Sequence, residues 1–223
     1  MTTILAGGRP LTLLAEKAVL VAASGTLLVA DAHIGKAVSF RALGVPVPRG
    51  TTSETLAGLA ALVRRTGARR IVFLGDFLHS PRAHAPATLA AVAAWRDAHR
   101  SLELVLVRGN HDDRAGDPPA PLAIRVVDEP FIDSGLALCH HPRPLPGHYV
   151  LAGHLHPCVH VGARSWDHLR LPCFWFGDTV GVLPAFGAFT GMHPVRCRPR
   201  DRIFAIADSL VAPMRAAAER FAA

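Results

Sequence analysis

The stretch Arg70–Asp76, RIVFLGD, is a short apolar run that ends in a glycine and a carboxylate. A continuous run of β-branched and aromatic residues bounded by glycine is typical of a strand buried on both faces. A second run of this kind, Leu102–Val107, leads into the sequence Gly109-Asn110-His111-Asp112. Each run follows a stretch with helical spacing, so the alternation predicts a parallel sheet with right-handed crossovers.

The two helical stretches are Thr51–Ala68 and Pro86–Arg100. In the first, leucines recur at helical spacing, Thr51 and Glu54 match a capping box, and Gly67 suits the C-terminal cap. These signals predict helices between the strands of the first half of the chain.

The second half has short apolar runs punctuated by Pro and Gly, with no long helix between them, which predicts a second, mixed or antiparallel sheet packed on the first. The runs are Leu136–Cys139, Tyr149–Ala152, Cys158–Val161, Leu169–Phe176, Val180–Leu183 and Ile203–Ala207. Near the start, Ala18–Ala22 and Thr26–Ala30 predict a hairpin. Asp112–Pro121 is interpreted as a loop too short to separate domains, so we expect one α/β domain over residues 1–223.

Composition narrows the class of protein. A hydrophobic share of 50% with 18% charged residues excludes intrinsic disorder. Charged and turn-forming residues keep every apolar run well short of the roughly 20 residues that a membrane helix needs. The first ten residues lack a basic region followed by an apolar one, so we expect no secretory signal and a cytoplasmic location. The four cysteines form no C-x-x-C pair and are expected to be reduced core residues.

The net charge of +7 favours phosphate polyanions as partners, although an arginine-rich coding bias explains it equally well. All of the 24 basic residues except Lys17 and Lys36 are arginines. Arg196, Arg198, Arg200 and Arg202 would share one face of an extended segment and suit a phosphate backbone, but the intervening Pro199 and Asp201 favour a solvated turn.

Nearly every strand predicted to be buried ends in side chains that bind metals. They are Asp31 and His33, Asp76, Asn110 and His111, His140 and His141, and His154 and His156. Because the carboxyl ends of strands converge on one crevice, we expect a dense cation site there. Oxygen and nitrogen donors without thiolate favour manganese, iron or zinc. In Asp31-x-His33 and His154-x-His156 the paired side chains share a side if the backbone is extended, and can serve different metals if it is a loop.

In this order the blocks D-x-H, G-D, G-N-H-D, H and G-H-x-H resemble the signature of the calcineurin-like metallophosphoesterases, over the range 31–156. The resemblance implies an α/β fold, the four-layer α/β/β/α metallophosphoesterase sandwich, in which two packed mixed sheets are flanked by helices. It also implies two divalent metals, Mn²⁺ foremost, with Fe or Zn as alternatives.

The resemblance assigns the site residues one by one. One metal is held by Asp31, His33, Asp76 and His156; the second is held by Asp76, Asn110, His140 and His154, with Asp76 bridging. His141 is the alternative to His140, which we prefer because it directly follows Cys139 at the strand end. His111 resembles the family histidine that contacts the phosphate and protonates the leaving oxygen after in-line attack by a metal-bridging hydroxide.

A narrower resemblance covers the segments 31–36, 44–50, 75–80 and 139–142, which are similar to the ligase-associated DNA-damage-response endonucleases of that superfamily. It implies manganese-dependent cleavage of DNA phosphodiesters in repair, with single-stranded DNA as substrate, and association with a DNA ligase, a helicase and a nuclease. Lys36 and His79 lie near predicted strand ends and are either phosphate contacts or solvated loop residues.

Two other functions fit the same residues. A small-molecule phosphoesterase acting on nucleotides or phosphomonoesters would use the same dinuclear site, but its turnover would not depend on surface arginines. A binding scaffold that has lost catalysis is disfavoured because no ligand position and no leaving-group acid is missing. Trp166, Trp175 and Phe176 could stack on bases, although their apolar surroundings favour core packing.

Overall fold

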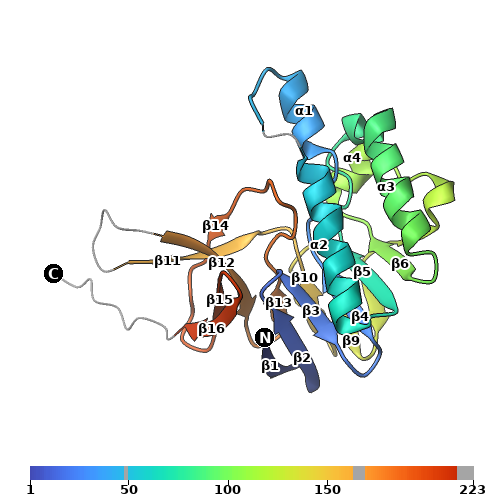
Figure 1. Cartoon of the computed structure of the whole chain (residues 1–223). Helices are drawn as coiled ribbons and strands as arrows, with labels where there is room; N and C mark the ends of the chain where they lie inside the picture. The colour runs from blue at the N-terminus through green and yellow to red at the C-terminus, as the bar shows by residue number, and fades with distance from the viewer. Residues whose placement is uncertain (48–49, 163–168, 215–223) are drawn as a thin grey trace.

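The structure is a computed structural model that describes residues 1–47, 50–162 and 169–214. Trp166 lies outside the described residues. Two β-sheets pack face to face, and the α-helices lie together on one side of the molecule (Figure 1). No described helix combines the length and the apolar character that crossing a membrane requires.

The first sheet has seven strands in the order β1-β2-β3-β4-β5-β6-β7. They are β1 Thr2–Ala6, β2 Arg9–Leu14, β3 Ala18–Val21, β4 Thr26–Val29, β5 Arg70–Leu74, β6 Glu103–Val107 and β7 Ile124–Val127. Strands β1 to β4 pair antiparallel, and β4 to β7 pair parallel. The predicted hairpin and the predicted parallel strands are both confirmed.

The helices connect the strands of the first sheet. They are α1 Lys36–Ala42, α2 Thr51–Thr66, α3 Pro86–Ala98 and α4 Asn110–Ala115, with 3-10 turns at η1 Pro81–His84 and η2 Ala120–Leu122. The expected loop over Asp112–Pro121 is therefore wrong in its first part, where α4 turns the chain directly after β6.

The ends of α2 correct one prediction and confirm another. The N-cap is Gly50, with φ 89°, and no side chain caps the helix, so the capping box of Thr51 and Glu54 does not form. A glycine in the left-handed region begins the helix one residue earlier than the predicted cap. Gly67, with φ 64°, closes the helix as expected and donates its N–H to the Val63 carbonyl.

The second sheet has nine strands, with the order β14-β11-β12-β13-β10-β9-β8 and with β15 and β16 added beside β12. They are β8 Phe131–Asp133, β9 Leu136–Leu138, β10 Tyr149–Ala152, β11 Pro157–Val161, β12 Leu169–Phe176, β13 Val180–Val182, β14 His193–Pro194, β15 Arg202–Ala207 and β16 Leu210–Met214. Strand β10 is parallel to β9 and β13, whereas β12 is antiparallel to its neighbours. All six apolar runs predicted as strands are strands, and the sheet is mixed.

Strand alternation divides the core into layers. In β5, Val72 and Leu74 face the second sheet, where they join Phe174 and Phe176 of β12. Ile71 and Phe73 face the other way and join the leucines of α2. The α/β class with two packed mixed sheets is confirmed, and the described α-helices form one flanking layer, on the first sheet.

In the described residues no α-helix follows Ala115, so none covers the outer face of the second sheet. A small apolar cluster on that face includes Cys139, Val150 and Ala152. All four cysteines are free; Cys139, Cys158 and Cys173 are buried as expected, whereas Cys197 is exposed.

The packing of α2 on the first sheet gives a test of stability. Leu59 is fully buried in that layer, so Leu59→Ala should lower the free energy of unfolding by about 2–5 kcal/mol through lost apolar contact and the cavity left behind. Urea denaturation measures the loss. Leu210→Ala, at a side chain 60% exposed on β16, is the control and should change stability by less than about 0.5 kcal/mol. Equal losses in the two variants would contradict this assignment of the core.

Candidate metal centre

Five strand ends deliver the polar residues to one place. Asp31 follows β4, Asp76 follows β5, Asn110 follows β6, His140 follows β9 and His154 follows β10. The first three strands belong to the first sheet and the last two to the second. The centre therefore lies where the ends of the two packed sheets meet.

The backbone is left-handed at three of these five strand ends and at the two histidines that follow Asp31 and His154. The φ angles are 53° at Asp31, 46° at His33, 52° at Asp76, 70° at His154 and 48° at His156. Positive φ is uncommon outside glycine and gathers at functional sites. The loop geometry decides the question that the sequence left open: His154 and His156 point to different groups of donors, whereas Asp31 and His33 share one.

The first group contains Asp31, His33, Asp76 and His156. The Nε2 atoms of His33 and His156 lie 3.3 Å apart. His156 Nε2 is 3.5 Å from Asp31 Oδ1, and His33 Nε2 is 3.9 Å from Asp76 Oδ2. The side chains of Asp31, His33 and Asp76 are almost fully buried. The donor atoms of Asp31, His33 and His156 lie within 4.8 Å of one another, and Asp76 approaches them beside His33.

The second group surrounds His140, which is fully buried. Its Nε2 lies 3.0 Å from Asn110 Oδ1, 3.0 Å from His154 Nδ1 and 3.4 Å from Asp76 Oδ1. The two oxygens of Asp76 therefore face different groups. One carboxylate is shared between two sets of donors.

The imidazoles present lone pairs to these groups. His140 Nδ1 lies 3.0 Å from the Leu74 carbonyl, which only accepts, so Nδ1 carries the proton and Nε2 the lone pair. His156 Nδ1 is likewise 3.1 Å from the Gly191 carbonyl. Burial, with Lys36 and the other histidines, holds the pKa of His33 far below its ordinary value. Imidazole nitrogens and carboxylates that converge in a buried site fit divalent cations, because burying such a cluster is costly without a cation to compensate the carboxylates.

Two glycines make room for the centre. A Cβ on Gly75, whose φ is 79°, would lie 2.1 Å from His140 Nδ1. A Cβ on Gly109 would lie 2.4 Å from Asp76 Oδ1. The close approach of these side chains to the backbone therefore requires glycine both before Asp76 and before Asn110.

Asp112 and Glu129 hold the centre together, and neither was predicted from the sequence to have a role. Asp112 is fully buried and accepts the N–H groups of Leu78, at 2.9 Å, and Gly109, at 3.0 Å; burial raises its pKa to about 6. Asp112 stands in the G-N-H-D block, so its position was visible in the sequence. Glu129 precedes a proline outside every motif, and no pattern identifies it.

Glu129 explains why the adjacent His140 and His141 have different side-chain partners. Its Oε2 accepts the N–H groups of His140 and His141, and its Oε1 lies 2.8 Å from His141 Nδ1. Burial opposes ionisation of Glu129, but these donors outweigh it and leave its pKa below the ordinary value. His140 thus reaches Asp76 and Asn110, while His141 pairs with Glu129 and lies at the edge, its ring 4.7 Å from that of His154.

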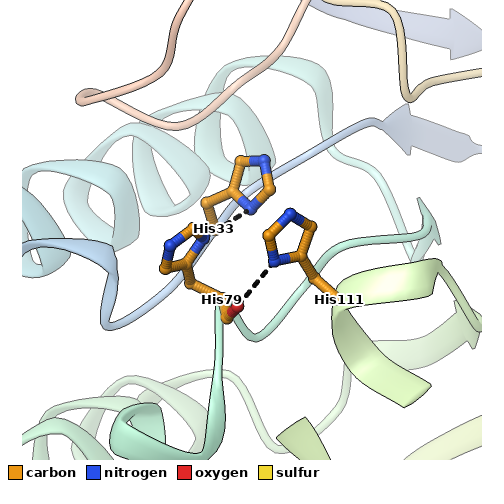
Figure 2. A group of neighbouring side chains, drawn as sticks. All are labelled: His33, His79 and His111. Atoms are coloured by element: carbon orange, nitrogen blue, oxygen red, sulfur yellow. Dashed lines mark hydrogen bonds between the residues drawn. The ribbon is translucent and has the colours of Figure 1, made fainter. Parts of the chain in front are cut away.

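His33, His79 and His111 form a third cluster beside the first group (Figure 2). His111 donates its backbone N–H to Asp76 Oδ1 at 2.9 Å, and its Nδ1 lies 2.7 Å from the His79 carbonyl. Its Nε2 lies 3.9 Å from Asp76 Oδ2. The His79 ring stacks on His111 at 4.7 Å and approaches His33, with 3.4 Å between the two Nδ1 atoms. Burial, reinforced by His111, lowers the pKa of His79 to about 4.

Lys36 also lies beside the centre, at the start of α1. Burial lowers the pKa of its ammonium, and the carboxylates of Asp31 and Asp76 oppose that shift. Its Nζ lies 5.8 Å from the ring centre of Phe40. Every residue predicted for the site is therefore in or next to it.

This fold, with its donors at the strand ends, is that of a hydrolytic phosphoesterase. The crystal structure of Pseudomonas putida nuclease MPE superposes on the chain with a TM-score of 0.84 and 45% sequence identity, covering 96% of this chain and 99% of that one. The chain belongs to the same family of metallophosphoesterase nucleases.

Yfce, a phosphoesterase from E. coli, is a much weaker match, with a TM-score of 0.42 and 15% identity over 85% of this chain and 97% of that one. That likeness is too distant to inform the site. No protein-family model matches the chain, and no curated protein does.

The role of Asp112 can be tested against its neighbour. Asp112→Ala leaves two buried N–H groups without an acceptor, at a cost of about 1–3 kcal/mol each in unfolding free energy. Denaturation in metal-free buffer measures the loss. Asp113→Ala, at a side chain 65% exposed on the same helix, should cost little. Similar stability in the two variants would show that Asp112 does not anchor the loops.

Proposed function

We propose that the chain is a phosphodiesterase that cleaves DNA, preferring single strands, with two divalent metals at the strand ends. The observation that carries the proposal is the position of Asp76, whose two oxygens face two separate groups of nitrogen and oxygen donors. The 45% identity to a nuclease supports a nucleic acid as substrate. A role in DNA repair beside a ligase, a helicase and a nuclease remains a prediction of the sequence resemblance.

The metal ligands we propose follow the two groups. Asp31, His33, Asp76 and His156 hold one ion; Asp76, Asn110, His140 and His154 hold the other. Mixed oxygen and nitrogen donors without a thiolate favour Mn²⁺, with Fe or Zn as alternatives. When bound, such ions lower the pKa of a water molecule and neutralise charge on the phosphoryl oxygens.

His111 is the proposed general acid. Because its Nδ1 is held by the His79 carbonyl, Nε2 is the atom left to carry a transferable proton. That Nε2 atom lies 3.9 Å from Asp76 Oδ2, at the edge of the proposed metal site. The stacked ring of His79 holds the imidazole in that orientation, so Nε2 can give its proton to the leaving oxygen of the strand.

Lys36 and His79 are proposed to contact the phosphate. The Lys36 ammonium, partly buried between the carboxylates and the solvent, supplies a cation that a phosphate oxygen can meet at short range. The net charge of +7 adds a long-range attraction for a polyanion. A DNA substrate should therefore give a steep dependence on salt, which a small phosphoester would not.

Asp76→Ala tests the metal centre and the substrate together. The variant should lose both ions and all Mn²⁺-dependent cleavage of end-labelled single-stranded and duplex DNA, because both groups lose their shared carboxylate. Calorimetric titration with Mn²⁺ and gel analysis measure the two losses. Asp97→Ala, at an exposed helix carboxylate, is the matched control. If the wild-type protein hydrolyses p-nitrophenyl esters but leaves DNA intact, it is a phosphoesterase and the assignment of DNA as its substrate is wrong.

His111→Ala separates the proposed acid from the ligands. Its backbone N–H to Asp76 remains, so Mn²⁺ affinity should be retained. Turnover of DNA should fall about 10²–10⁴-fold, the usual contribution of general acid catalysis, because the deoxyribose oxygen leaves poorly without a proton. Bis(p-nitrophenyl) phosphate, whose leaving group needs no proton, should be affected far less. Wild-type turnover of DNA by the variant would remove this role from His111.

A further inference from the structure

A cavity of about 670 Å³ lies on the outer face of the second sheet, beside the metal centre but outside it. Its floor includes Trp175 of β12 with Val180 and Val182 of β13, and Pro142 and Leu155 form part of its wall. We call it the Trp175 cavity. No described α-helix covers this face, and the volume is within the range of about 300–1,000 Å³ common for ligand sites.

Strand register gives its distance from β10, the strand that supplies His154. Trp175 pairs with Val182, and Val182 pairs with Ala152, two residues before His154. Two strand spacings place Trp175 about 10 Å from Ala152 across the sheet. Leu155, in the cavity wall, lies between the candidate ligands His154 and His156. The cavity thus begins at the edge of the metal centre.

The lining has the chemistry of a nucleobase site. The Trp175 indole and the Pro142 and Pro144 rings offer flat apolar surfaces. Two arginines and two aspartates also line the cavity. Arg200 pairs with exposed Asp178 at 2.8 Å, and Asp201 accepts the backbone N–H of Arg198. The Arg198 guanidinium has no hydrogen bond or ion pair to any described residue, so it is the cation available to a ligand. Aromatic and apolar surface beside cations suits a base attached to a phosphate, whereas a wholly apolar ligand would leave these cations unused.

We propose that the Trp175 cavity binds one unpaired nucleobase of the substrate strand while a neighbouring phosphate lies at the metal centre. The inference rests on the proposed function and adds the part of the substrate that is recognised. The distance of about 10 Å from Trp175 to the end of β10, the strand that supplies His154, corresponds to about three stacked nucleotides, and to fewer when the strand is extended. A paired base enters only after it is unpaired and unstacked, so the cavity selects single strands.

The test uses the wild-type protein and an end-labelled oligothymidylate with one abasic residue at a fixed position. Cleavage with Mn²⁺ is mapped linkage by linkage. We expect cleavage to fall about tenfold at one fixed offset, within three nucleotides of the abasic residue, because base–aromatic stacking contributes that much or more. Uniform cleavage along the strand would overturn the cavity assignment alone. Absence of any DNA cleavage would overturn the proposed function and this inference with it.

Variants then identify the cavity as the source of the offset. Trp175→Ala should remove the offset and lower the ratio of DNA turnover to bis(p-nitrophenyl) phosphate turnover about tenfold, and Trp175→Phe should restore both. Arg198→Ala, at an exposed side chain that does not endanger folding, should raise KM for DNA and flatten its salt dependence relative to the control Arg100→Ala. An equal fall on both substrates in Trp175→Ala would mean a structural role and overturn the proposal.

Discussion

The Asp76 carboxylate is the constraint on which the rest of the structure depends. It is nearly fully buried, its oxygens face two groups of donors, and it accepts the backbone N–H of His111. Burial of this carboxylate near that of Asp31 is costly without compensating charge. The surrounding backbone must therefore hold both in place against repulsion, which explains the left-handed residues and the glycines packed around them.

Both sheets contribute to holding the carboxylates of Asp31 and Asp76 in place. The Asp31 N–H donates to the Gly75 carbonyl and the His33 N–H to the Asp76 carbonyl, so the loops after β4 and β5 are tied together. The His154 N–H donates to the Asp31 carboxylate, which joins the second sheet to the first. Because β9 and β10 supply His140 and His154, neither sheet can form the centre alone. The buried layer between the sheets fixes the distance between their contributions.

The elements predicted best are those with a strong local pattern. Buried strands such as Arg70–Leu74 are unbroken apolar runs, and polar residues at their ends predicted the centre because parallel strands end together. Side-chain roles set by tertiary contacts were not predictable. Gly50 rather than Thr51 caps α2, α4 forms within an expected loop, and Glu129 reaches the backbone of His140 from outside every motif.

Successive side chains of β12 point to opposite faces of the second sheet, one toward the core and the other toward the Trp175 cavity. Phe174 and Phe176 point into the layer between the sheets, so the core role expected for Phe176 is confirmed. Trp175 lies between them and therefore faces the other way, toward a sheet surface that no described helix covers. A large ring on that face adds nothing to the core between the sheets, and it is level with the end of β10 that supplies His154. Because side chains alternate along the strand, Phe174 and Phe176 stabilise the fold, whereas Trp175 between them is available for the proposed contact with the substrate.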